Sequence, residues 1–326
     1  MDKKYDVTAL GELLIDFTEN GISVQGNPVL EANPGGAPCN VLAMLKKLSH
    51  TVTFVGKVGR DMFGDLLEQA LVEVGIDTSG LVRDSDVHTT LAFVQKKADG
   101  DRDFSFYRNP GADMMLKEEE VLEKKELIEN CRIFHFGTLS MTHENCRKAT
   151  KKAIELAKAA GAVISFDPNL REPLWDSLDN AKEQVEYGLT KCNVLKISDN
   201  EIKWLTGIDD YDEAVGSIQE KYPDISLILV SLGKEGSLAY SNRTKVFEKP
   251  FLLENTIETT GAGDTFCAGI LHYVLEHGLK NYSEEELAEM LTFANAGASL
   301  ITTKKGALRV MPDLAEVENL VSKRHS

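Results

Sequence analysis

The feature that most constrains this fold is a regular alternation of short apolar strands with amphipathic helices. Apolar segments of strand length recur at residues 51–58, 132–136, 162–166, 193–197 and 226–230. The segments between them repeat apolar residues at three- and four-residue spacing, which is the pattern of a helix with one buried face. Strands separated by helices of this length predict βαβ units and a mainly parallel sheet with helices on both faces.

Two parts of the chain depart from this alternation. Residues 90–95 and 103–108 predict two strands, and the polar segment between them predicts a hairpin turn. Short extended pieces are also expected in the turn-rich segment that follows the first strand. We therefore expect one domain over residues 1–326, with a small lid sheet built from strands at about 12–33 and 88–110.

Composition narrows the class of partner. The chain carries 52 acidic and 36 basic residues, a formal net charge of −16, which argues against nucleic acid or an anionic membrane as its partner. Its five cysteines are odd in number and form no CxxC motif, as expected of reduced thiols. The first apolar run is interrupted by Gly11, Glu12 and Asp16, unlike a signal peptide. A cytoplasmic protein with no membrane span is expected.

The segment Ile257–Gly269 is the strongest candidate for chemistry. The small residues Gly261, Ala262 and Gly263 predict a turn that allows close backbone approach, and a helical pattern begins at the next residue, Asp264. The start of a helix has unpaired N–H groups and the positive end of the helix dipole, so it suits a phosphate group. A carboxylate beside such a site indicates acid–base work. The alternative is a helix that is simply capped after a tight turn.

Polar residues also follow the C-terminal ends of several predicted strands. Ligands of open α/β sheets bind at this edge of the sheet. Asp16 is expected at the end of the first strand, and Asp167 to Asn169 follow the strand at 162–166. Lys196, Ser198 and Glu201 follow the next strand, and Gly233 follows the one after it. Because these strand ends share one edge of a parallel sheet, we expect their side chains to converge.

The segment Asn33–Asn40 contains two glycines at the entry to a helix, so the backbone there can approach a ligand closely. The amide of Asn40 suits the hydroxyls of a ligand, and a helix-entry turn with Pro38 near its start is the alternative. No GxxxxGK[ST], helix-opening GxGxxG or protein-kinase HRD and DFG set is present. The histidines show no ligand spacing in sequence, and His135 is expected to be a buried packing residue.

Two segments resemble the signatures of the ribokinase-like (PfkB) carbohydrate kinases. The first is Asn33–Asn40 with Val58–Gly64 behind it, and the second is Glu258–Phe266. The resemblance covers nearly the whole chain and is closest to the fructokinases. The segments that carry the fructokinase resemblance are Gly11–Phe17, Gly35–Pro38, Phe106–Asp113, Asp167–Trp175 and Lys196–Glu201. It implies a three-layer α/β fold and ATP-dependent phosphorylation of a sugar's primary hydroxyl.

The resemblance also implies a role for each site residue. Asp264 would be the base, and Arg171 would reach the phosphates or the sugar. The anion hole would be formed by the amides of Gly261, Ala262, Gly263 and Asp264. The sugar would be held by Asp16, Gly35, Gly36 and Asn40 and covered by Phe104, Phe106 and Arg108. The nucleotide site would be lined by Lys196, Ser231, Gly233, Gly236 and Asn295.

The chain departs from the family pattern at two positions that concern metal ions. Ser198 stands where the family usually has Asn in the Asn-x-x-Glu motif, whose Glu201 would organise Mg²⁺ through water. Glu258 stands where the second signature often has Asp. Glu258 and Thr260 are therefore the candidates for a K⁺ site.

The leading hypothesis is phosphorylation of the 6-hydroxyl of D-fructose to give fructose 6-phosphate. The alternatives are ribokinase, 2-keto-3-deoxygluconate kinase and aminoimidazole riboside kinase, of which the second would suit Arg108 because its sugar is acidic. A non-catalytic sugar sensor would predict a lost base or a broken anion hole, and both motifs are intact. The resemblance further implies a homodimer that pairs through the lid.

Overall fold

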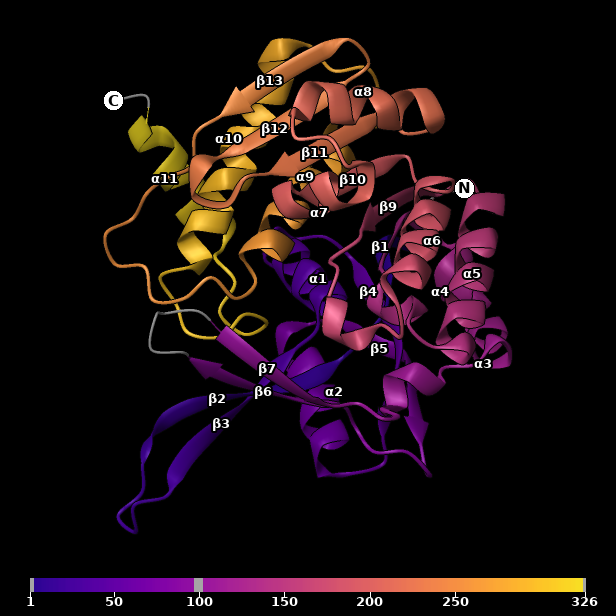
Figure 1. Ribbon diagram of the computed structural model, residues 1–326, viewed down its shortest axis with the longest axis vertical. Helices are drawn as coiled ribbons and strands as arrows, with labels where there is room; N and C mark the ends of the chain where they lie inside the picture. Colours follow the sequence, from indigo (N-terminus) through magenta and orange to yellow (C-terminus); the bar gives the residue numbers. More distant parts are fainter. Residues whose placement is uncertain (1–2, 97–101, 325–326) are drawn as a thin grey trace.

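The computed structural model describes residues 3–96 and 102–324 (Figure 1). Within these residues the chain forms a nine-stranded sheet and a four-stranded sheet. The large sheet runs, from edge to edge, β13 (Thr244–Glu248), β12 (Ser237–Ser241), β11 (Leu227–Ser231), β10 (Val194–Ser198), β9 (Val163–Asp167), β8 (Cys131–Gly137), β1 (Tyr5–Leu10), β4 (Val52–Gly59) and β5 (Asp77–Asp84). Neighbouring strands from β5 to β11 are parallel, whereas β12 and β13 are antiparallel. The predicted mainly parallel sheet is confirmed.

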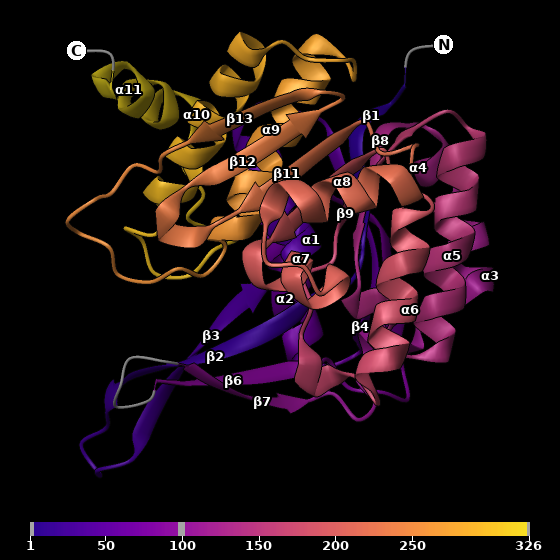
Figure 2. The same cartoon turned by 45° about the horizontal axis from the view of Figure 1, so that its top comes forward.

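The helices cover the sheet on two faces, so the fold has three layers (Figure 2). One core packs beneath α1 (Ala37–Lys47), α2 (Met62–Val74), α9 (Ala262–His277), α10 (Glu284–Ile301) and α11 (Leu314–Arg324). The other packs beneath α3 (Glu118–Glu123), α4 (Lys125–Glu129), α5 (Glu144–Ala159), α6 (Leu178–Leu189), α7 (Asp199–Thr206) and α8 (Tyr211–Lys221). Short 3-10 turns lie at η1 (Ala112–Met115), η2 (Leu139–Met141), η3 (Glu172–Leu174) and η4 (Gly233–Glu235). No helix among the described residues is long and apolar enough to cross a membrane.

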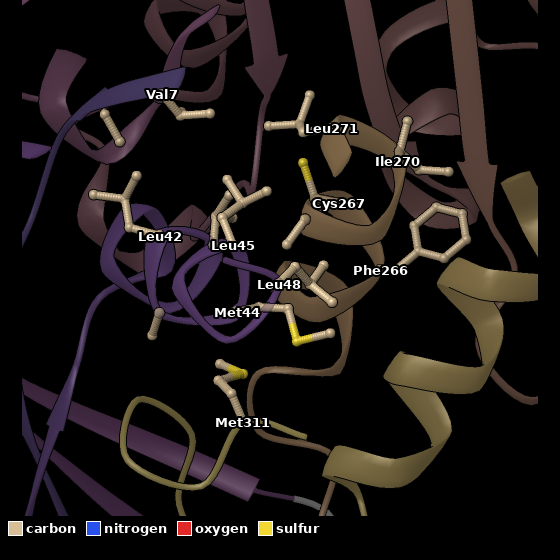
Figure 3. Packing of buried hydrophobic residues seen from close by; sticks show 14 of the residues in the cluster. Val7, Leu42, Met44, Leu45, Leu48, Phe266, Cys267, Ile270, Leu271 and Met311 are labelled. Atoms are coloured by element: carbon tan, nitrogen blue, oxygen red, sulfur yellow. The ribbon is translucent and has the colours of Figure 1, made fainter. Parts of the chain in front are cut away.

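Helices α1 and α9 pack side by side at the centre of the first core (Figure 3). Leu45 of α1 faces Cys267 and Leu271 of α9, and all three side chains are buried. Burying large aliphatic side chains fully stabilises the fold by about 1.5–3 kcal/mol each. This packing fixes the two helix N-termini relative to each other, which matters because each carries a polar site residue.

The four-stranded sheet has the order β3-β2-β6-β7 and forms a lid. Its strands are β2 (Leu14–Ile22), β3 (Pro28–Gly35), β6 (Leu91–Lys96) and β7 (Arg102–Tyr107). Beyond β6, the β2–β3 hairpin continues as an arm that extends away from the body (Figures 1 and 2). Phe17 of β2 stacks on Phe93 of β6 with ring centroids 4.9 Å apart, and it meets Phe63 of α2 edge to face at 5.6 Å. These ring contacts hold one face of the lid against the body.

Three details of the expected element order were wrong. The first strand ends at Leu10 and the chain enters β2 at Leu14, so Asp16 lies in the lid sheet and not at the end of β1. The sequence favours one continuous helix over residues 118–130, but the structure has two helices there, α3 and α4, with Lys124 between them. The edge strand β5 was not expected, because its sequence is half polar and only one of its residues is buried.

Candidate active site

A cavity of about 760 Å³ lies between the lid sheet and the C-terminal ends of the central strands. Its walls come from β2, β3 and the starts of α1 and α9, together with loops that follow the strands. The expected site residues that line it are Asp16, Gly35, Gly36, Asn40, Phe106, Arg171, Lys196, Glu258, Thr260, Gly261, Gly263 and Asp264. The ends of the parallel strands and the lid thus bring together residues that are far apart in sequence.

The centre of the cavity is a hydrogen-bonded pair between the two packed helices. Asn40, in the first turn of α1, donates from Nδ2 to Oδ2 of Asp264, in the first turn of α9, over 2.8 Å. Burial raises the pKa of Asp264, and the bond from Asn40 together with the positive charges of Lys196 and Arg171 partly opposes this rise. The Oδ1 atom of Asn40 is buried and has no protein partner. A buried amide oxygen that lacks a protein partner, on a residue that lines the cavity, is suited to accept from a ligand hydroxyl.

The turn before α9 places backbone N–H groups beside this pair. Gly261 has a φ of 76°, a conformation that glycine adopts without strain, and a Cβ there would lie 2.8 Å from the Ala307 side chain. The Ala262 amide already donates to the Thr259 carbonyl oxygen over 3.2 Å. The amides of Gly263 and Asp264 lie in the first helical turn, where no preceding carbonyl of the helix can accept from them. These amides are the donors that an anion in the cavity would meet.

The lid presents a second carboxylate to the cavity. Leu14, Asp16 and Thr18 alternate along β2 and line the cavity, while Phe17 between them points to the other face of the lid. Burial raises the pKa of Asp16 to about 7; Arg171 opposes the rise, and the carboxylates of Asp264 and Glu258 add to it. A Cβ on Gly35 would lie 2.4 Å from the Oδ2 atom of Asp16, so this glycine leaves room for the carboxylate.

A buried ion pair lies beside the cavity, and its lysine, Lys196, lines the cavity. Lys196 on β10 donates from Nζ to Oδ2 of Asp167 on β9 over 2.9 Å, and both side chains are buried. Burial raises the pKa of Asp167 to about 6 against the opposing charge of Lys196. The other oxygen of Asp167, Oδ1, is buried without a protein partner. Carboxylate oxygens are the ligands that Mg²⁺ prefers, so the Asp167 carboxylate fits a hydrated magnesium ion.

Glu201 fixes the loop that follows β9. Its Oε1 accepts from the Leu170 amide over 2.6 Å, and its Oε2 accepts from the Ser198 amide and hydroxyl over 2.8 and 2.7 Å. Ser198 in turn caps α7 with a bond to the Glu201 amide, so the two residues form a capping box. Ser198 therefore caps the start of α7, at the position where the Asn-x-x-Glu motif has asparagine. The same bonds hold the backbone beside Arg171, which lies next in the chain.

Glu258 and the loop after α10 close the cavity on another side. Oε1 of Glu258 accepts from the Gly306 amide over 2.8 Å, and the Ile257 and Glu258 amides both donate to the Thr302 carbonyl oxygen. Glu258 is buried, with 8% of the residue exposed. The second signature is thereby tied to residues 302–307, a segment in which the sequence showed no candidate.

The structure places several expected site residues away from this cavity. Arg108 is buried and forms an ion pair with Asp113, and its guanidinium also donates to the Thr142 hydroxyl and the Leu139 carbonyl oxygen, each over 2.9 Å. The charge of Arg108 is therefore paired with another residue of the protein, next to the end of the lid strand β7. Phe104 lies on β7, but its side chain is outside the described part of the structure.

The remaining nucleotide residues follow β11 and β12 and lie beyond the lining of the cavity. Ser231 ends β11, Gly233 is the first residue of the turn η4 that follows it, and Gly236 comes directly after that turn. Asn295 on α10 accepts from the Ser237 hydroxyl over 3.0 Å, and its Nδ2 donates to the Glu248 and Lys249 carbonyl oxygens. Asn295 thus holds α10 to the antiparallel edge of the sheet.

Sequence reasoning missed Glu12 and the segment Lys305–Ala307, which also line the cavity. Glu12 is 3% exposed, and its Oε1 accepts from the Ala37 amide at the start of α1 over 2.9 Å. Burial raises the pKa of Glu12 to about 7. The sequence does contain a signal for Glu12. It is a single glutamate directly after an apolar strand, and a charged residue in such a place is rarely buried without a partner. His135 is buried with Nδ1 3.0 Å from the Ser165 hydroxyl, as expected of a packing residue.

Comparisons with known proteins agree with this architecture. The model of the pfkB family of carbohydrate kinases matches residues 4–314. Fructokinase-1 of Zea mays is 41% identical over 319 residues, which cover 97% of this chain and 98% of the relative. The crystal structure of Xylella fastidiosa fructokinase with bound ATP superposes with a TM-score of 0.89 at 31% identity and covers 99% of this chain and 100% of that one. A fructokinase double mutant from Vibrio cholerae O395, in a form with fructose, ADP and potassium ion bound, has a TM-score of 0.86 at 27% identity and covers 98% of this chain and 99% of that one. The chain belongs to the pfkB family of carbohydrate kinases.

Proposed function

We propose that this chain is a fructokinase that transfers the terminal phosphoryl group of ATP to the 6-hydroxyl of D-fructose. The observation that carries the proposal is the Asn40–Asp264 pair at the junction of two helix starts, with a second carboxylate, Asp16, across the cavity. Relatives at about two-fifths identity over nearly the whole length are fructokinases. We propose that residues 1–326 act as one catalytic domain beneath the lid.

In the proposed reaction, Asp264 accepts the proton of the attacking sugar hydroxyl. A base must lie within hydrogen-bonding distance of the proton that it removes, and a raised pKa makes a carboxylate a better proton acceptor. Asn40 holds the Asp264 carboxylate through one oxygen, which leaves the other to face the hydroxyl. Phosphoryl transfer depends mainly on positioning and on charge stabilisation. The amides of Gly263 and Asp264 would stabilise the charge of the transferring group, and Ala262 would contribute through the shape of the turn.

The sugar would be held from the lid side of the cavity. Asp16 can accept from two neighbouring hydroxyls, and the unpaired Oδ1 of Asn40 can accept from another. Gly35 and Gly36 allow the sugar ring to approach the backbone, and Phe106 offers an apolar surface over it. We propose that Arg171 bridges the two sites, because its charge acts on both Asp16 and Asp264.

The nucleotide would lie on the side of the cavity that faces β10 to β12. Lys196 lines the cavity there, and Ser231, Gly233, Gly236 and Asn295 would form the part of the site beyond it. When bound, Mg²⁺ would neutralise charge on the phosphates. We propose that the free oxygen of Asp167 and the Glu201 carboxylate hold its water ligands. A K⁺ site is proposed at Glu258 and Thr260, where the second signature meets the loop after α10.

We propose that two chains pair through their lid arms. Ile22 and Val24 at the tip of the arm are exposed, as are Val29 and Leu30 on its second strand, and an apolar β-hairpin exposed in this way favours pairing with another chain. A cytoplasmic location is proposed from the thiols, because all five cysteines are free and buried.

The substrate is tested by measuring ADP release with D-fructose, D-ribose, adenosine and 2-keto-3-deoxygluconate under one set of conditions, with the product identified by ³¹P NMR. We expect the highest kcat/KM with D-fructose and a product phosphorylated on the 6-hydroxyl. The acidic sugar is disfavoured because Arg108, the residue that would suit it, is paired with Asp113. Equal or higher kcat/KM with another acceptor would refute fructose as the substrate.

A further inference from the structure

A cluster of two imidazoles and a carboxylate lies away from the active-site cavity, between the ends of the same two helices. His50 follows the C-terminal end of α1, and His272 and Glu276 lie one turn apart on α9. Within the described residues, these three form a group of potential metal ligands whose donor atoms all lie within 4.8 Å of one another. Along α9, His272 is about 12 Å from Asp264 at the helical rise of about 1.5 Å per residue.

We propose that His50, His272 and Glu276 form a binding site for a divalent transition-metal ion such as Zn²⁺, which would link the C-terminal end of α1 to α9. Two imidazoles and one carboxylate are a ligand set that binds Zn²⁺ with a fourth position left for water. Imidazole ligands favour Zn²⁺, Cu²⁺ or Ni²⁺ over Mg²⁺ or Ca²⁺. The site is therefore chemically distinct from the magnesium site of a kinase.

The two imidazoles are already oriented toward each other. Nε2 of His50 lies 2.8 Å from Nδ1 of His272, a hydrogen-bonding distance. Tetrahedral ligands about 2.0–2.1 Å from a metal are separated by about 3.3 Å, so the rings need to part by only about half an ångström. Glu276 is exposed and can rotate toward them. The metal would replace the proton shared by the two rings, and the proton of His272 would then reside on its Nε2 atom.

A second carboxylate supports His50 from behind, as is common for metal-binding histidines. Nδ1 of His50 lies 3.7 Å from Oδ2 of Asp6, which is itself held by the Thr51 amide over 2.9 Å. A carboxylate near Nδ1 directs the proton to that atom and leaves the lone pair of Nε2 for a metal. Arg132 pairs with the other oxygen of Asp6 over 3.0 Å, so one positive charge also lies nearby.

The residues around the two histidines hold the imidazoles in place and leave His272 accessible to an ion. The His50 amide donates to the Leu45 carbonyl oxygen over 3.1 Å, and the ring of Phe293 packs 5.1 Å from that of His272. His272 also lines a separate cavity of about 580 Å³ between α9, α10 and α11. An ion can therefore reach an imidazole that is held in place by its neighbours.

The proposal is tested by titrating Zn²⁺ into the nucleotide-free, magnesium-free, tag-free protein by calorimetry, and by recording the visible spectrum with Co²⁺. The variants are His272→Gln and Glu276→Gln, and the control is His277→Gln, a histidine on the same helix that lines the same cavity. We expect one equivalent of Zn²⁺ in the wild type, a tetrahedral Co²⁺ spectrum, and a loss of affinity of at least about tenfold in both variants but not in the control.

Thermal unfolding separates metal binding from a folding defect, since Glu276 is exposed and its substitution should leave the metal-free protein intact. Zn²⁺ should raise the Tm of the wild type and of His277→Gln, and it should raise the Tm of Glu276→Gln by less. Stoichiometric binding that survives in both variants, or is lost equally in the control, would overturn the proposal. Failure of the wild type to bind one equivalent would overturn it as well.

Discussion

At the scale of single residues, this site contains carboxyl groups whose pKa values are raised by burial. Burial raises the pKa of Asp264, and it raises the pKa of both Asp16 and Glu12 to about 7. Such groups oppose folding once they ionise, because their charge has left water without full compensation. They are retained where a function needs a proton acceptor of raised pKa.

Glu12 gives a direct test of this cost. The folded protein keeps its carboxyl protonated between the ordinary pKa of 4.5 and about 7, where the unfolded chain is ionised. The folded state then binds more protons, so the free energy of unfolding falls as the pH rises through this window. Replacing Glu12 by Gln should remove this fall, which is on the order of 3 kcal/mol.

The measurement is urea unfolding of the wild type and Glu12→Gln at pH 5 and pH 8. Glutamine retains the oxygen that accepts from the Ala37 amide, so the helix start is preserved. We expect the variant to gain stability relative to the wild type at pH 8 but not at pH 5. A difference between the proteins that is the same at both pH values would show that ionisation of Glu12 is not its cause.

The sequence indicated some of the residues that pair in the site but not the partners of others. The Gly-rich turn before Asp264 and the amide of Asn40 were apparent as motifs, and the structure joins them over 2.8 Å. The family resemblance assigned Arg108 to the sugar, but in the structure its guanidinium pairs with Asp113, five residues further along the chain. Glu12 is a lone charge after an apolar strand, but no sequence pattern indicates its partner, which is a backbone amide 25 positions away. Contacts between distant segments are set by tertiary packing, which periodicity does not report.

At the scale of elements, the site is the meeting point of two helix starts and one lid strand. The packing of α1 on α9 sets the Asn40–Asp264 distance, and the pairing of β2 with β3 sets Asp16 opposite Asn33. Strand periodicity then turns Asp16 to the cavity and Phe17 to α2. The sequence predicted the parallel strands other than β5, and both helices. It did not predict the long arm, because the exposed strands of the arm have no buried face to impose alternation.

The register of β2 and β3 predicts the effect of a methyl group at position 35. A Cβ on Gly35 would lie 2.4 Å from Oδ2 of Asp16, so Gly35→Ala should displace this carboxylate. We expect KM for fructose to rise by roughly tenfold or more, because small misplacements of positioning groups are costly. The helix substitution Gly216→Ala, where a Cβ meets no atom within 4 Å, is the control and should leave KM unchanged. An unchanged KM in Gly35→Ala would remove Asp16 from the sugar site.

At the scale of the whole molecule, the arm extends beyond the body with an apolar tip. Val24 at the tip is fully exposed, and Val72 on α2 is 60% exposed on a different surface. If two chains pair through their arms, Val24→Glu should shift the dimer toward the monomer, because it places a charge in an apolar interface. Light scattering coupled to size exclusion measures the mass, and Val72→Glu is the matched control. A dimer that Val24→Glu leaves intact, or a wild-type monomer, would refute pairing through the arm.

The central claim is that Asp264 acts as the base in phosphoryl transfer to fructose. The most direct test is the single-turnover rate of fructose phosphorylation by Asp264→Asn, with the Kd for fructose measured on the same protein by calorimetry. We predict a fall in rate of about 10²–10⁴-fold, the range expected for loss of a general base, with fructose affinity within a few-fold of the wild type. Asparagine is nearly isosteric with aspartate, so the cavity keeps its shape. A near-normal rate in this variant would contradict the account.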